Sequence, residues 1–280
     1  MAQTQSTPFL IKTIGQALNV LALVSTSKAA KLAIDVFSKP RKGKLVSDNL
    51  SFLSQSEMIQ LEYNGLKIKT YYWPGVKGCV LLAHGWESNS SRWEKAVQSF
   101  QEKGLGVVAV DAPAHGGSGS DYFNAILFSK FIHVSILHYK PEALIGHSVG
   151  GMSCAFANRD YQYPFLKKIV LLGAPNEFKD ILSRYSSMLG YSDRLIIGID
   201  NEIYRRFGSW PDSYATANFV KETDIPILIV HDKEDKIIPY SDAIAIASHC
   251  KNGTLKSTEG YGHGLRSSQL LSDIVSYICK

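Results

Sequence analysis

The spacing of apolar residues along the chain changes its character near residue 57. Before that point, over residues 8–38, apolar side chains recur every three or four positions, which is typical of an amphipathic helix. Pro8 suits the first turn of such a helix, and Pro40 lies where it ends. The polar stretch 25–28 is a candidate break, which would divide the segment into two helices.

Beyond residue 57 the pattern alternates between strands and helices. The first two strands flank Asn64-Gly65, a pair that favours a tight hairpin turn. The predicted strands are 58–63, 66–73, 79–83, 106–110, 143–145, 168–172, 226–230 and 253–257. The predicted helices are 91–103, 122–139, 149–158, 241–250 and 265–278. An antiparallel start followed by repeated strand–helix units predicts an α/β fold, with a mostly parallel sheet covered by helices on both faces.

One stretch, residues 176–222, interrupts this alternation. Its apolar residues repeat at helical spacing, so it is expected to form a helical insertion at the edge of the sheet. The predicted organisation is an N-terminal helical arm over residues 1–50 and an α/β domain over residues 51–280, which carries the insertion.

Composition narrows the class of protein. The chain has 280 residues, of which 45% are hydrophobic and 20% charged, as in an ordinary globular protein. The net charge is +5, but residues 1–45 hold seven basic side chains and one acidic, so the rest of the chain is close to neutral. A nucleic-acid-binding protein concentrates basic charge on its folded part, so no nucleic-acid partner is expected.

The basic N-terminal segment admits three interpretations. We favour a helical arm that packs on the rest of the protein. A basic amphipathic helix on a membrane surface is the second, and it would give peripheral membrane contact through residues 1–45. A signal peptide is the third, although the apolar stretch is short and no basic region precedes it.

Four cysteines are scattered along the chain without a C-x-x-C pair or metal-ligand spacing. We interpret them as free thiols in a reducing compartment, which predicts a cytoplasmic location. No metal site is expected.

The strongest chemical motif is Gly146-His147-Ser148-Val149-Gly150, which has the form G-x-S-x-G. It follows a short apolar strand and opens a helix, as a nucleophile elbow requires. Glycines two residues on either side of Ser148 let strand and helix approach closely. We therefore expect Ser148 to be a nucleophile.

A serine hydroxyl needs an adjacent base, and His263 is the favoured candidate among eight histidines. It lies in a glycine-rich turn after the last predicted strand. The base in turn needs a carboxylate. We favour Asp235, in the loop after strand 226–230, with Asp232 and Glu234 as alternatives.

Acyl transfer also needs donors for the oxyanion. The Val149 amide, at the start of the helix after the nucleophile, is one candidate. The Trp86 amide, in the His84-Gly85-Trp86 loop after strand 79–83, is the second. We expect the His84 side chain itself to be a buried structural group.

These motifs together resemble the α/β-hydrolase superfamily, in its esterase, lysophospholipase and serine-aminopeptidase-like branch. The resemblance covers residues 57–280. It includes the turn Asp111–Ser118, which resembles the family's Asp-x-Pro-x-x-Gly-x-Ser turn and is one residue longer than the shortest form of that turn, and the loop from His231 to Pro239. In the family the residue after this histidine is often Gly, whereas this chain has Asp232. The resemblance implies that residues 176–222 are a cap that shapes the substrate pocket.

The expected activity is hydrolysis of a small-molecule carboxylic ester or thioester through Ser148, His263 and Asp235, without a cofactor. Alternatives are an acyltransferase or small-residue aminopeptidase on the same fold, and a non-catalytic hydrolase fold used for binding. Acyl chain length, leaving group, pathway and oligomeric state are not determined by the sequence.

Overall fold

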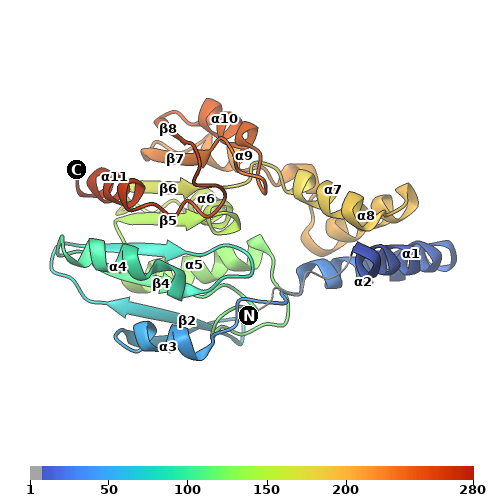
Figure 1. Cartoon of the computed structure of the whole chain (residues 1–280), viewed down its shortest axis with the longest axis horizontal. Coiled ribbons are helices and arrows are strands. Elements are labelled where there is room, and N and C mark those ends of the chain that lie inside the picture. The colour runs from blue at the N-terminus through green and yellow to red at the C-terminus, as the bar shows by residue number, and fades with distance from the viewer. Residues whose placement is uncertain (1–7) are drawn as a thin grey trace. The chain divides into compact units, whose positions relative to one another are not determined.

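The computed structural model describes residues 8–280, which form two compact units (Figure 1). One unit, here called the sheet unit, comprises Pro40–Asn176 and Thr216–Lys280. The other, here called the helical unit, comprises the described chain up to Lys39 together with Glu177–Ala215. Both units are therefore built from segments that are distant in the sequence.

The sheet unit is built around a mostly parallel sheet, which among the described residues has eight strands in the order β1-β2-β4-β3-β5-β6-β7-β8. The strands are β1 (Glu57–Tyr63), β2 (Leu66–Trp73), β3 (Cys79–Ala83), β4 (Gly106–Val110), β5 (Ala143–His147), β6 (Lys168–Leu172), β7 (Ile227–Asp232) and β8 (Gly253–Thr258). Strands β1, β2 and β4 pair antiparallel, and all later pairs are parallel. The predicted α/β fold is confirmed.

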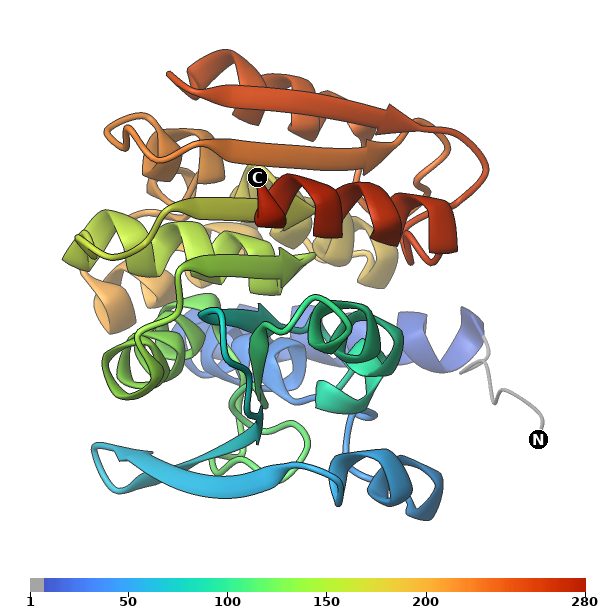
Figure 2. The same cartoon turned by 90° about the vertical axis from the view of Figure 1, so that its left-hand side faces the viewer.

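Helices cover both faces of this sheet (Figure 2). One face carries α3 (Ser47–Leu53), α4 (Glu94–Gln101) and α11 (Ser268–Cys279), whose apolar side chains share a core with the strands. The other carries α5 (Ala125–Tyr139), α6 (Val149–Tyr161), α9 (Thr216–Val220) and α10 (Tyr240–His249). The central strands β3, β4 and β5 are buried along their whole length, which explains their continuous apolar sequences.

Local sequence signals explain most element boundaries. Asn64 and Gly65 both have positive φ, 48° and 77°, as a tight hairpin turn requires. Asn124 caps α5 by accepting a hydrogen bond from the Leu127 amide, so this helix begins three residues later than its apolar pattern suggests. The predicted helix 91–103 is divided into a 3₁₀ turn, η1 (Ser90–Trp93), and α4.

Helix α3 was not predicted, because its seven residues are too few to show a periodic pattern. Tertiary packing stabilises it instead. The ring of Phe52 stacks on that of Trp73, with centroids 4.9 Å apart.

The helical unit packs α1 (Pro8–Val24) and α2 (Thr26–Ser38) against α7 (Phe178–Leu189) and α8 (Asp193–Phe207). The expected break in the N-terminal segment lies at Ser25, which caps α2. Helices α2 and α8 approach closely at Gly198, where a Cβ atom would lie 2.6 Å from Cγ2 of Thr26. The N-terminal helices thus share a core with the inserted helices, and the short 3₁₀ turn η2 (Pro211–Ser213) follows α8.

A polar network also connects the N-terminal and inserted segments of the helical unit. Arg206 of α8 bonds to Asp35 of α2 at 3.0 Å and to Glu202 at 2.7 Å. Hydrogen bonds from Arg205 and Arg206 lower the pKa of the buried Glu202 to about 2. Glu202 is therefore ionised at neutral pH and fully paired.

Two further observations concern the described residues. No helix within residues 8–280 is both long and apolar enough to cross a membrane. The four cysteines in this part of the chain are free thiols.

Candidate active site

The G-x-S-x-G motif forms a sharp turn between β5 and α6. Ser148 adopts φ 54° and ψ −129°, a backbone conformation that is costly for a residue with a Cβ atom. Gly146 and Gly150 make this turn sterically accessible. A Cβ at Gly150 would lie 2.4 Å from the carbonyl oxygen of His84, and one at Gly146 would lie 2.4 Å from Cα of Gly151. The strained turn holds the Ser148 side chain at the carboxyl end of β5.

His263 lies within hydrogen-bonding distance of this serine. Its Nε2 is 3.1 Å from Oγ of Ser148, although the two residues are 115 positions apart. The imidazole comes from the loop between β8 and α11, where Gly260 and Gly262 have positive φ. The parallel sheet brings this loop and the elbow to the same edge.

Asp235 completes the contact on the other side of the imidazole. Its Oδ2 is 2.7 Å from Nδ1 of His263, and its Oδ1 accepts the amides of Ile237 and Ile238 at 2.8 and 3.0 Å. Burial by itself would raise the pKa of Asp235, but hydrogen bonds from His231, His263 and these amides outweigh it and hold the pKa far below its usual range. The carboxylate is therefore ionised and accepts the Nδ1 proton of His263.

Asp232, the alternative acid, faces a different set of groups. Its Oδ2 accepts hydrogen bonds from Oγ1 of Thr258 at 2.8 Å and from the Tyr261 amide at 2.9 Å. Its Oδ1 accepts the Glu234 amide at 3.0 Å. Asp232 therefore ties the loop after β7 to β8 and to the start of the His263 loop, and the structure brings Asp235 to the imidazole.

The loop after β3 approaches the elbow directly. A Cβ at Gly85 would lie 3.0 Å from Cβ of Ser148, so glycine permits this contact. Neither the Trp86 nor the Val149 amide donates to another group within the described residues. Both predicted oxyanion donors are thus unoccupied N–H groups, on the loop beside Ser148 and on the residue after it.

His84 and the Asp111 turn support this loop. His84 is fully buried, donates from Nδ1 to the Gly85 carbonyl and accepts the Ala112 amide at Nε2. Burial lowers its pKa to about 3, so it is neutral. Asp111 is also fully buried, and it accepts hydrogen bonds from both the amide and the hydroxyl of Ser90. These groups are structural rather than reactive.

Three polar side chains beside the site were not predicted to have a role there. His147 and Arg92 contact each other next to the elbow. His231 is buried at the end of β7, with Nε2 2.9 Å from the Ile238 carbonyl and 3.4 Å from Oδ2 of Asp235. Burial by itself would lower the pKa of His231, but the interaction with Asp235 outweighs it and raises the pKa. The one sequence signal for this contact was the position of His231, four residues before Asp235.

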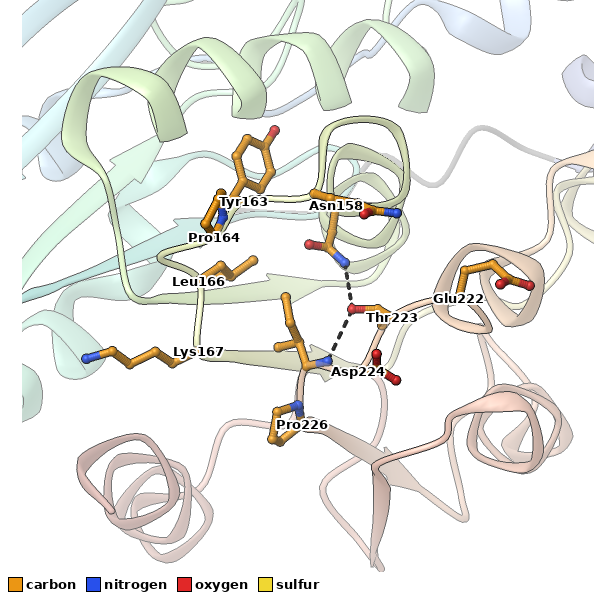
Figure 3. Close-up of a pocket in the computed structure, with 11 residues that line it drawn as sticks. Asn158, Tyr163, Pro164, Leu166, Lys167, Glu222, Thr223, Asp224 and Pro226 are labelled. Carbon is orange, nitrogen blue, oxygen red and sulfur yellow. Dashed lines mark hydrogen bonds between the residues drawn. The ribbon is translucent and has the colours of Figure 1, made fainter.

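A surface hollow lies elsewhere on the sheet unit (Figure 3). It is lined by residues of α6 and of the segments that precede β6 and β7, namely Asn158, Gln162, Tyr163, Pro164, Leu166, Lys167 and residues 222–226. The amide of Asn158 donates to Oγ1 of Thr223 there. This hollow is at the amino ends of the strands, whereas ligands of open α/β sheets bind at the carboxyl ends, where Ser148 lies. No group of three or more His, Cys, Asp or Glu within residues 8–280 is arranged to hold a metal.

Comparisons with known proteins relate this chain to one family model and to several curated proteins. The model of the family described as alpha/beta hydrolase fold matches residues 78–191. A monoacylglycerol lipase of Mycolicibacterium smegmatis (strain ATCC 700084 / mc(2)155) is 33% identical over 249 residues, covering 72% of this chain and 88% of that protein. A non-heme chloroperoxidase of Burkholderia pyrrocinia is 25% identical over 255 residues, covering 71% and 91%.

Solved structures show the same fold. An esterase from Exiguobacterium antarcticum superposes with a TM-score of 0.61 at 18% identity, covering 80% of this chain and 100% of that one. A bromoperoxidase structure from Bacillus anthracis gives a TM-score of 0.62 at 17% identity, covering 80% of this chain and 100% of that one. With the strand order, the elbow and a relative at 33% identity, the chain belongs to the alpha/beta hydrolase family.

Proposed function

We propose that this protein is a serine hydrolase that cleaves a carboxylic ester or thioester through Ser148, His263 and Asp235. The observation that carries the proposal is the position of His263, whose two ring nitrogens lie 3.1 Å from Oγ of Ser148 and 2.7 Å from Oδ2 of Asp235. A nucleophile, a base and an orienting carboxylate in this order are the groups that acyl transfer needs.

Acylation would proceed in the following way. With Nδ1–H donating to the ionised Asp235, the lone pair of His263 Nε2 faces Ser148 and accepts its proton as Oγ attacks the carbonyl carbon. The free amides of Val149 and Trp86 are available to stabilise the oxyanion of the tetrahedral intermediate. His263 then gives its proton to the leaving alcohol or thiol, and an acyl-enzyme on Ser148 remains.

Deacylation uses the same groups. Water donates a proton to His263 Nε2 as its oxygen attacks the acyl carbon, and the collapse of the second tetrahedral intermediate returns the proton to Ser148 Oγ. The carboxylic acid leaves. Neither half of the cycle calls for a cofactor.

The names of two relatives guide the choice of substrates to test on this protein. The M. smegmatis relative is named a monoacylglycerol lipase, as is the mouse protein ABHD6, which is 23% identical over 261 residues. Monoacylglycerols are therefore the first natural substrates to test, together with a series of p-nitrophenyl esters of increasing acyl length. The chain-length optimum will measure the acyl pocket.

The decisive experiment is labelling with a fluorophosphonate probe. We expect wild type to be labelled and Ser148→Ala not to be. Ser153→Ala is the matched control, because Ser153 lies on α6 with its hydroxyl bonded to the Val149 carbonyl and away from the base. Labelling should survive in that variant. A folded wild type that neither reacts with the probe nor hydrolyses any ester of the series would refute the proposal.

A further inference from the structure

The side chain of His147 connects the nucleophile to the loop that carries the base. His147 immediately precedes Ser148 and is only 5% exposed. Its Nε2 lies 2.8 Å from the backbone carbonyl oxygen of His263, 116 residues away. Its Nδ1 contacts NH1 of Arg92 in η1. One imidazole thus joins three segments of the sheet unit.

The chemistry of these partners determines which proton His147 carries. A carbonyl oxygen can only accept a hydrogen bond. Nε2 of His147 therefore carries a hydrogen, which it donates to the backbone carbonyl oxygen of His263. A guanidinium only donates, so Nδ1 of His147 is the acceptor of the Arg92 hydrogen bond. Burial and the positive charge of Arg92 lower the pKa of His147 well below its usual value, in agreement with a neutral ring.

The loop that carries His263 needs such an anchor. His263 is flanked by Gly262 and Gly264, and Gly260 and Gly262 adopt positive φ. Glycine-rich backbone loses more conformational entropy on ordering than other sequences do. The His263 ring can be held near Ser148 only if the backbone that carries it is held as well, and the His147 hydrogen bond acts on the carbonyl of His263 itself.

Arg92 is placed for this contact rather than for an ion pair. Within the described residues it has no carboxylate partner, and the positive charge of Arg266 repels it. Its guanidinium packs over the ring of Trp93 at 4.9 Å, and NH2 lies 3.4 Å from the Gly264 carbonyl. Burial and Arg266 lower its pKa to about 9, which leaves it charged at neutral pH. Arg92 therefore reaches the same loop directly and through His147.

We propose that Arg92 and His147 are positioning residues, which hold the backbone of His263 and thereby keep its Nε2 in line with Oγ of Ser148. This inference rests on the proposed function, since it assigns a role for these residues in that reaction. A positioning role differs from a general structural role in two ways. Arg92 and His147 act on one loop, and the imidazole of His147 must carry a donor at Nε2 and an acceptor at Nδ1.

The test compares His147→Phe, His147→Gln and Arg92→Met with wild type. Phenylalanine keeps an aromatic ring at position 147 but can form neither of the two hydrogen bonds of His147. Glutamine has an amide N–H that can donate and an amide oxygen that can accept. Turnover of a p-nitrophenyl ester is measured per fluorophosphonate-titrated site, so that misfolded protein is not counted. His138→Phe, an exposed histidine on α5, is the matched control.

We expect His147→Phe to lower kcat by about 10- to 100-fold, since a displacement near 1 Å of a catalytic group has that effect, while KM changes by less than about threefold. His147→Gln should recover most of the loss, and Arg92→Met should lower kcat in the same direction. A structural role alone would lower the number of titrated sites and leave kcat per site unchanged.

Hydrogen exchange of amides 260–266, measured by mass spectrometry on the full chain, provides a readout that needs no activity. We expect faster exchange there in His147→Phe and Arg92→Met than in wild type or His138→Phe. Unchanged loop exchange, or unchanged kcat per site, in both variants would overturn the positioning role. An inactive and unlabelled wild type would instead overturn the proposed function, so the two failures are separate observations.

Discussion

At the scale of single residues, the site depends on the carboxylate of Asp235, which accepts hydrogen bonds from several groups at once. Asp235 receives the His263 ring on one oxygen and two backbone amides on the other, and its side chain has no exposed surface. Asp232, three positions earlier, bonds to Thr258 and Tyr261 instead. The two aspartates therefore differ in their partners although they lie only three residues apart, at the end of β7 and in the loop after it.

This difference predicts opposite effects of two matched substitutions. Asp235→Asn should reduce kcat for ester hydrolysis by about 10⁴-fold, because the amide stabilises neither the required tautomer nor the imidazolium. Asp232→Asn should lower the unfolding free energy but change kcat by less than about tenfold. Steady-state kinetics and urea unfolding of both variants decide this. A larger loss of kcat in Asp232→Asn would reverse the assignment of the acid.

The low pKa of Asp235 predicts how stability depends on pH. A carboxyl whose folded pKa lies below its unfolded value of about 3.9 stabilises the fold above that value, and the contribution is lost as pH falls toward the folded pKa. The difference in unfolding free energy between wild type and Asp235→Asn should thus be larger at pH 6 than at pH 3. Urea titrations at both values measure it, and a difference independent of pH would contradict the ionised, paired carboxylate.

At the scale of elements, the elbow depends on the contact between α6 and β3. The amino end of α6 lies against the end of β3, and a Cβ at Gly150 would lie 2.5 Å from the Ala83 carbonyl oxygen and 2.4 Å from that of His84. Both atoms belong to backbone and cannot move without shifting the strand or the loop beside Ser148. The glycine is therefore required by packing, not by its own φ.

Gly150→Ala should accordingly destabilise the protein by about 1–3 kcal/mol, as overpacking of a dense core does, and should also impair acylation of Ser148. Gly264→Ala is the control for stability, since a Cβ there would meet only Cγ of Arg266 at 3.8 Å. We expect that control to stay within about 0.5 kcal/mol of wild type. Thermal unfolding and the rate of fluorophosphonate labelling provide the two measurements.

At the scale of the whole molecule, the N-terminal helices complete the helical unit. Buried residues of α1 and α2 share a core with those of α7 and α8. The members of this core are Leu18, Ala22, Ala29, Ala30, Ala33, Ile34, Leu182, Leu189, Tyr191, Leu195, Ile199 and Ile203. Neither segment can bury its apolar face alone, so each requires the other.

Removal of residues 1–39 should therefore expose the apolar faces of α7 and α8. We expect increased binding of an apolar dye and rapid proteolysis within 177–215, with the sheet unit left intact. Gly198→Val is the point variant that tests the same contact, since its side chain would collide with Thr26. A truncated chain with wild-type protease resistance over 177–215 would show that the inserted helices do not need the arm.

The N-terminal helices also carry the proposed membrane contact. Val20, Leu23 and Val24 are 64%, 68% and 85% exposed, and the exposed Lys28 and Lys31 follow on α2. Apolar and basic groups together favour an anionic lipid surface. We expect co-sedimentation with phosphatidylserine vesicles that is weakened by salt and by Leu23→Glu. Equal sedimentation of wild type and Leu23→Glu would exclude this surface.

Local patterns in the sequence already determined much of this molecule. The alternation of strands and helices, the hairpin at Asn64-Gly65 and the strained turn at Ser148 depend on residues that are close in the chain, because dihedral preferences and side-chain periodicity are local. For the same reason the sequence named Ser148, His263 and Asp235 as candidates, since each lies just after a predicted strand.

Contacts between distant residues were decided only by the tertiary structure. The sequence favoured Asp235 but left Asp232 open as an alternative, and only the path of the chain in three dimensions presents Asp235 to His263. The pairing of the N-terminal arm with the inserted helices, and the contact of His147 with the carbonyl of His263, likewise join segments more than 100 residues apart. No local propensity encodes such pairs, because they form only when the sheet brings its loops to one edge and the helices bury one another's apolar faces.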